Sequence, residues 1–186
     1  MTVSTQEAVA ALDDVARVHH RSAVLRGYEY GAPHFLLWGV IWLIGYGGTY
    51  LYPAAAGPLW LVLDVLGIGG SYLFVRAAPR CASAADSARG ARFAALALAI
   101  AGFIAATYYV LRPHNALQYA AFPPLLMAFI YTAIGVWRGV RWAAIGITLA
   151  ALTVTGYAFL PAYFIAWMAV CGSASLLLTG LWMRRA

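Results

Sequence analysis

The stretch PLWLVLDVLGIGGSYLFVR, residues 58–76, decides the fold of this chain. It is apolar over the length of α-helix that crosses a bilayer, which is about 20 residues. One carboxylate, Asp64, stands near its middle. Placing an ionised side chain at the centre of a bilayer costs at least about 2.5–3.5 kcal/mol, so such a residue normally faces protein. The stretch therefore predicts a transmembrane helix whose carboxyl needs a partner.

The composition places the rest of the chain in a membrane as well. Of the 186 residues, 64% are hydrophobic and 10% are charged, and the mean hydropathy is +0.79, which lies outside the range of soluble domains. We predict an all-α integral membrane protein with a six-helix transmembrane bundle over 31–186. Its expected spans are 34–52, 58–75, 92–111, 116–137, 142–159 and 162–183.

The arginines indicate the orientation. All twelve basic residues are arginine, and eleven of them lie before the first span, between spans two and three, between spans four and five, or after span six. Cytoplasmic loops carry the excess of basic residues, so both termini are expected in the cytoplasm. Arginine without lysine is typical of a GC-rich bacterial genome and favours the bacterial inner membrane. Because topology and anionic lipid account for the charge, we expect no nucleic-acid partner.

Residues 1–30 form a separate cytoplasmic segment. STQE at 4–7 is a capping box, and apolar residues interleaved with charged ones follow it. This pattern predicts an amphipathic helix over 5–26, with early acids and late bases that suit the helix dipole. We expect it to lie on the membrane or the bundle, or to bind a partner protein. Its candidate contact residues are Leu12, Val15, Arg17 and Arg21.

Small residues follow Asp64 in the second span. Gly67 and Ser71 are four residues apart on one helical face, and Asp64 precedes Gly67 by three residues. Since small residues let another backbone approach closely, Asp64 is expected to face a neighbouring helix. Two interpretations stay open: a protonated carboxyl that hydrogen-bonds helices together, and a carboxyl that handles a proton, a cation or a polar ligand.

Three similar turns predict a repeat. They read TYLYP at 49–53, YYVLRP at 108–113 and YAFLP at 157–161, and each leads into a span that ends on arginine. We infer three tandem helical hairpins in the same orientation. Eleven residues after each of these prolines lie Asp64, Pro124 and Gly172, so irregular structure is expected at one depth in all three even-numbered spans.

Tandem prolines lie inside the fourth span. Proline lacks a backbone donor and clashes with the preceding turn, so carbonyls around Tyr119 and Ala120 lose their partners and need protein or water instead. Helix breaks and ionisable groups near mid-membrane commonly form the binding sites of transporters. In the alternative interpretation they mark only where helices pack. The ligand or proton candidates are Asp64, Pro123, Pro124 and Cys171.

Aromatic side chains follow a familiar membrane pattern. Tyrosine and tryptophan gather at the expected span ends as aromatic belts, and Tyr108 is among them. Trp38, Trp42 and Tyr46 form a stripe along the first span. The stripe is expected to pack in the core or to wall a cavity.

Enzymatic and metal chemistry have little support in the sequence. None of the four histidines stands well inside a span, so neither a haem nor a metal site is expected, and no cofactor is predicted. HExxH, a Walker loop and a matched set of serine, histidine and acid are all missing from the sequence. Cys81 and Cys171 are expected to be free thiols. We therefore expect a protein that is not an enzyme.

Two functions follow. The leading hypothesis is a non-enzymatic polytopic inner-membrane protein that acts as a scaffold, regulatory or accessory subunit, with Asp64 as a buried interhelical bond and the N-terminal helix as a partner-binding arm. The alternative is a small transporter or channel with a midplane site at Asp64 and a helix break at Pro123-Pro124. Both hypotheses have the lipid bilayer as a partner and leave a homo-oligomer open.

Overall fold

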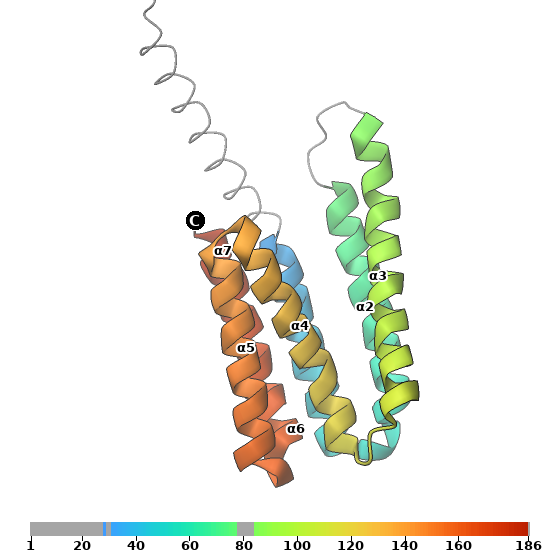
Figure 1. Cartoon of the computed structure of the whole chain (residues 1–186), viewed down its shortest axis with the longest axis vertical. Coiled ribbons are helices and arrows are strands. Elements are labelled where there is room, and N and C mark those ends of the chain that lie inside the picture. Colours follow the sequence, from blue (N-terminus) through green and yellow to red (C-terminus); the bar gives the residue numbers. More distant parts are fainter. Residues whose placement is uncertain (1–27, 29–30, 78–83, 186) are drawn as a thin grey trace, which may run out of the picture.

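The described part of the chain is helical and contains no strand. The computed structural model describes residues 28, 31–77 and 84–185. Its long helices run back and forth side by side (Figure 1). They are residues 31–51, α2 (Ala56–Ala77), α3 (Ala84–Leu111), α4 (Ala116–Arg138), α5 (Val140–Phe159), and a last helix made of α6 (Phe164–Trp167), η3 (Met168–Gly172) and α7 (Ser173–Arg184). The all-α prediction is confirmed.

Length and composition let five of the described helices cross a membrane. A further long helix, residues 31–51, runs beside them (Figure 1). The observed ends agree with the predicted spans to within a few residues, and the chain is a multi-pass membrane protein. The five spans are Pro53–Ala77, Ala91–Leu111, Ala116–Trp137, Val140–Phe159 and Pro161–Arg184.

Two of the three similar turns share their backbone geometry. Pro53 and Pro161 each begin a short 3-10 helix, η1 (Pro53–Ala55) and η2 (Pro161–Tyr163), where the missing proline N–H costs no hydrogen bond. The turn after Pro113 differs, because Asn115 caps α4 by accepting a hydrogen bond from the Gln118 N–H at 2.9 Å. We call this end of the bundle the proline end, and the end with Arg76, Arg141 and Arg184 the basic end.

Helices α4 and α5, which follow one another across Gly139, pack closely against each other. A Cβ added at Gly146 would lie 2.5 Å from the Ala128 carbonyl oxygen and would also meet the Thr132 hydroxyl. Glycine lets the two backbones touch, as is common between membrane helices. In the predicted arrangement α4 belongs to the second hairpin and α5 to the third. The three-hairpin arrangement is not confirmed.

Helix 31–51 packs on α2 through glycines on both sides. The Trp60 ring would be 2.7 Å from a Cβ at Gly45, and the Trp38 ring would be 2.8 Å from a Cβ at Gly67. Trp38 Nε1 also donates a hydrogen bond to Ser71 Oγ at 3.1 Å. Leu63, Gly67 and Ser71 are buried. The predicted close packing at Gly67 and Ser71 is confirmed, whereas Asp64, which was expected to share that face, is exposed.

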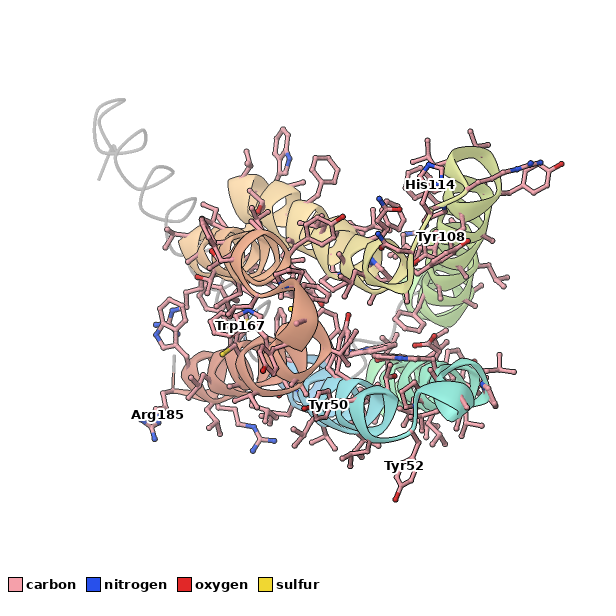
Figure 2. The ribbon with its side chains drawn as sticks, turned by 90° about the horizontal axis from the view of Figure 1, so that it is seen from below. Tyr50, Tyr52, Tyr108, His114, Trp167 and Arg185 are labelled. Atoms are coloured by element: carbon pink, nitrogen blue, oxygen red, sulfur yellow. The ribbon has the colours of Figure 1, made fainter. Side chains whose placement is uncertain are left out.

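The core lies between helix 31–51, α4, α5 and the last helix. Trp42 and Tyr46 are 6% and 3% exposed, so the aromatic stripe packs in the core. Trp167 reaches α5 and donates from Nε1 to the Leu152 carbonyl at 2.9 Å (Figure 2). Completely buried side chains fill the centre, among them Leu149, Phe164, Met168 and Leu176.

Only one of the even-numbered spans has an irregular backbone. The last helix contains a π-helix, η3, at the depth predicted from Cys171-Gly172-Ser173. Such segments often occur at functional sites. By contrast, α2 is a continuous helix through Asp64, and α4 stays helical through Pro123 and Pro124. The expected helix break at the double proline is therefore not present.

At the basic end of the bundle, Arg141 contacts one residue near the start of the described chain and one near its finish. Its guanidinium carbon lies 5.0 Å from the Tyr28 ring centroid and 4.8 Å from that of Trp182. Its Nη1 donates to the Trp182 carbonyl oxygen at 3.1 Å. A planar guanidinium can lie flat on aromatic rings while its N–H groups form hydrogen bonds, and an ammonium group has no such flat face.

Replacing Arg141 with glutamine is expected to lower the free energy of unfolding by about 1–2 kcal/mol, since each partly exposed cation–π contact contributes roughly 0.5–1 kcal/mol. Arg141→Lys should recover little of this loss, because lysine does not stack in the same way. Unfolding in lipid nanodiscs measures both effects. Arg184→Gln, at an exposed arginine of α7, is the control, and an equal loss there would contradict the assigned contacts.

The predicted N-terminal helix lies outside the described residues. So do its candidate contact residues, Leu12, Val15, Arg17 and Arg21, and the predicted free thiol of Cys81. The role of this segment stays a prediction.

Candidate functional site

The double proline of α4 leaves two backbone carbonyls without helical partners. In an α-helix the N–H groups of residues 123 and 124 would bond the carbonyls of Tyr119 and Ala120, and proline has no N–H to offer. Pro124 is fully buried, and α4 stays helical through both prolines. A carbonyl at membrane depth needs another donor. These two acceptors therefore determine which polar groups gather around α4.

Two tyrosine hydroxyls supply the missing donors. Tyr46 Oη, from helix 31–51, donates to the Ala120 carbonyl at 2.8 Å. Tyr108 Oη, from α3, donates to the Tyr119 carbonyl at 2.6 Å. The prediction that the freed carbonyls find partners is confirmed, and both partners come from other helices.

Aromatic contacts fix the position of the Tyr46 hydroxyl. The Tyr46 ring centroid lies 5.7 Å from that of Trp42 and 5.0 Å from that of Trp60, both nearly edge-on. Trp60 Nε1 in turn donates to Thr49 Oγ1 at 3.0 Å, and the Thr49 hydroxyl donates to the Gly45 carbonyl at 2.7 Å. This series of contacts orients Tyr46 toward α4.

Tyr108 connects α3 to α4. Its ring centroid lies 4.8 Å from that of Tyr119 and 5.6 Å from that of Phe122. Phe103, also on α3, stacks on Phe122 at 6.3 Å. The end-on view shows Tyr108 reaching from α3 toward α4 (Figure 2). The sequence assigned Tyr108 to an interfacial belt, and its hydrogen bond gives it a second role.

Asp64 lies one helical turn after Trp60 on α2. Its side chain is exposed, although Leu63 and Gly67 beside it are buried. Among the described residues it makes no hydrogen bond and no ion pair, so the expected buried interhelical bond is not found. Asp64 is thus a polar group without a hydrogen-bond partner among the described residues, one turn along α2 from the Trp60 ring that packs on Tyr46.

Asp64 and Pro124 lie at the same depth. Each comes eight residues after the first residue of its helix, Ala56 or Ala116. Both helices begin at the proline end and run in the same direction (Figure 1). At about 1.5 Å per residue, each position is about 12 Å from the start of its helix. The shared depth predicted from the repeated turns is therefore present.

The site offers oxygen atoms as ligands. A tyrosine hydroxyl that donates its proton keeps lone pairs on its oxygen, and each carbonyl oxygen has a second lone pair. The described residues contain no group of three His, Cys, Asp or Glu side chains.

The structure does not bring all of the candidate residues together. Pro123 and Pro124 belong to the hydrogen-bonded site that Tyr46 and Tyr108 complete, and among the described residues no hydrogen bond or ion pair joins Asp64 to it. Cys171 belongs to η3, which packs on α5 and α7, and it is a free thiol of intermediate exposure. The sequence did contain a signal for the two tyrosines, because each proline frees a carbonyl four residues earlier and a hydroxyl at that depth is a suitable donor.

Comparisons with known proteins give no indication of the function. No protein-family model matches this chain, and no match was found among curated proteins or solved structures. Function is therefore inferred from the polar site and from the helix surfaces.

Proposed function

We propose that this chain is a non-enzymatic inner-membrane protein that works as a scaffold, regulatory or accessory subunit by packing against another transmembrane helix. The proposal is based on the exposed surface of α3. In the span Ala91–Leu111 no residue is buried. The side of α3 that faces the rest of the chain is only partly covered, and its opposite side is free for a partner.

A row of small residues runs along the middle of the free side of α3, between bulkier exposed residues such as Leu96, Leu98 and Phe103. Ala95, Ala99, Gly102 and Ala106 are exposed, and their spacing of four, three and four residues places them on one helical face. A Cβ added at Gly102 would meet nothing within 4 Å. These positions form a smooth stripe, which we call the α3 stripe.

The exposed face of α2 has a different composition. It carries bulky apolar side chains, as a lipid-facing surface does, among them Leu61, Val62, Val65, Leu66 and Leu73. Contacts between membrane helices are instead enriched in glycine and alanine, which let backbones approach. The row of small residues favours α3 as the helix that contacts another polypeptide.

The proposed topology follows from the basic end. Arg76, Arg141 and Arg184 lie there, and the excess of arginine marks the cytoplasmic side of a bacterial inner membrane. Both termini would then be cytoplasmic, and the N-terminal segment would be a second contact for the same partner. The matching 3-10 turns at Pro53 and Pro161 support the proposal that the spans arose as hairpin repeats.

Gly102→Ile tests the subunit proposal. A branched side chain on the α3 stripe should prevent close helix packing, so the variant extracted in polymer nanodiscs should appear by native mass spectrometry as a single 20.0 kDa chain. The wild-type chain should carry a second membrane polypeptide, either another copy or a different protein. Gly69→Ile is the matched control, because a Cβ at Gly69 also meets nothing within 4 Å but lies on α2. A wild-type chain that is always alone, or a Gly102→Ile variant that keeps its partner, would exclude the proposal.

The second candidate function is a small transporter or channel. The observation that favours it is the exposed Asp64 carboxyl at the depth of the double proline. Charged groups and irregular hydrogen bonding near mid-membrane form the binding sites of many transporters. Ion flux into proteoliposomes that contain the purified chain separates this candidate from a subunit without transport activity.

A further inference from the structure

Arg141 and Arg185 meet at one backbone oxygen at the basic end. Arg141 Nη1 donates to the Trp182 carbonyl oxygen at 3.1 Å, and the Arg185 backbone N–H donates to the same oxygen at 3.3 Å. The Arg185 side chain is exposed and points away from the helices (Figure 2). Because the two residues share one hydrogen-bond acceptor, a single anion beside them can contact both guanidinium groups.

The Arg141 guanidinium is held in place before any ligand binds. The Tyr28 and Trp182 rings lie 5.0 Å and 4.8 Å from its central carbon, measured to the ring centroids. A guanidinium has five N–H donors in a rigid fork, and the Trp182 carbonyl accepts from one of its nitrogens. The side chain is half-buried, so part of it reaches the surface. A group that is fixed in this way loses little side-chain entropy when it binds a ligand.

The two arginines have no negative partner among the described residues, where neither forms an ion pair. The only acid whose side chain the structure describes is Asp64. It precedes Arg76 of the basic end by twelve residues, which is about 18 Å along α2. Neighbouring guanidinium groups repel each other, so an anion between them lowers the electrostatic energy. The pair therefore favours a negatively charged ligand.

An apolar surface continues from Arg185 toward membrane depth. Leu178, Leu181 and Trp182 are exposed, and their spacing places them on the face of α7 that ends at Arg185. Leu178 comes seven residues before Arg185, which is about 10 Å along the helix axis. Tryptophan typically lies at the level of the lipid headgroups. This face thus combines charge at the membrane surface with leucine at the depth of acyl chains.

We propose that Arg141 and Arg185 bind the phosphodiester of one anionic phospholipid, whose acyl chain lies along Leu178 and Leu181. Guanidinium groups recognise phosphate oxygens through paired hydrogen bonds. A phospholipid supplies both the negative charge and the apolar chain, whereas soluble phosphate supplies only the charge. A zwitterionic lipid is less suitable, because the arginines repel its positive group.

This lipid site is separate from the proposed subunit contact. Helices α5 and α7, which form the site, lie on the opposite side of the bundle from α3 (Figure 1). Basic sites between transmembrane helices are known to hold anionic headgroups. The lipid site is therefore independent of the α3 stripe and stands whether or not the chain works as a subunit.

Native mass spectrometry of the delipidated chain in a neutral detergent tests the site. Titration should show one phosphatidylglycerol molecule that binds at least about tenfold more tightly than phosphatidylcholine, because charged hydrogen bonds are gained. Arg185→Gln should weaken this first binding event about fivefold, the effect of one arginine near the membrane surface. Arg141→Gln should weaken it about tenfold or more, and Arg141→Lys should recover little, because lysine lacks the fork.

Arg92→Gln is the matched control. Arg92 is exposed on α3 at the same end of the bundle, so its loss removes the same charge away from Arg141 and should leave phosphatidylglycerol binding unchanged. Arg185→Gln alters an exposed side chain and keeps the backbone hydrogen bond, so it carries the test if the Arg141 variants do not fold. Equal affinities for the two lipids, equal losses in Arg92→Gln and Arg185→Gln, or displacement of the lipid by inorganic phosphate would each overturn the proposal.

Discussion

Gly146→Ala is expected to lower the free energy of unfolding by about 3 kcal/mol, the upper part of the usual range for overpacking. The added methyl group would collide with the Ala128 carbonyl and the Thr132 backbone N–H, at 2.5 Å from each atom. Backbone atoms cannot rotate away as the end of a side chain can, so α4 and α5 must separate. Their separation would also disturb the double proline, which lies on α4.

The control for this prediction is Gly69→Ala. A methyl group at Gly69 meets nothing within 4 Å, and alanine is the better helix former, so no loss of stability is expected there. Unfolding of both variants in the same lipid nanodiscs measures the difference. If Gly146→Ala proves no less stable than Gly69→Ala, then α4 and α5 do not pack as closely as described.

Tyr46→Phe is expected to lower the free energy of unfolding by about 2 kcal/mol, the cost of leaving a buried acceptor unsatisfied. The Ala120 carbonyl has no alternative helical donor, because residue 124 is proline. Tyr108→Phe should cost less, since its hydrogen bond to Tyr119 lies at an exposed position. Both variants keep the aromatic ring and its packing, so the loss of stability relative to the wild-type chain measures the contribution of the hydroxyl group.

The matched control for the tyrosine variants is Tyr157→Phe. Tyr157 is exposed at the end of α5, and its hydroxyl makes no hydrogen bond among the described residues. Its loss should change stability by less than about 0.5 kcal/mol, as is usual for surface substitutions. A Tyr46→Phe variant as stable as Tyr157→Phe would mean that the Ala120 carbonyl finds another donor.

Much of this architecture could be predicted from local sequence. The spans follow from runs of apolar residues, because the length of a helix in a bilayer is set by the bilayer's thickness. The contact face of Gly67 and Ser71 follows from helical periodicity. The need of the Tyr119 and Ala120 carbonyls for outside donors follows from the covalent structure of proline.

The remaining features depend on contacts between distant segments. Asp64 lies at the edge of a buried face, where a small rotation of α2 decides between burial and exposure, and helical periodicity does not resolve that rotation. Sequence similarity between turns favoured three hairpins, whereas close packing at Gly146 pairs α4 with α5. Tyr46 and Tyr108 looked like core and interfacial residues, and only the placement of helix 31–51 and α3 beside α4 reveals their hydrogen bonds.

The most direct test of the polar site is a double-mutant cycle between Tyr46→Phe and Pro124→Ala. Alanine at 124 restores an N–H that can bond the Ala120 carbonyl within α4. Tyr46→Phe should then cost less than about 0.5 kcal/mol in the Pro124→Ala background, compared with about 2 kcal/mol in the wild-type chain. The control combines Tyr46→Phe with Pro123→Ala. The two effects should be additive, because an N–H at residue 123 would bond the Tyr119 carbonyl and not the Ala120 carbonyl. An equal cost of Tyr46→Phe in the wild-type and Pro124→Ala backgrounds would contradict the account.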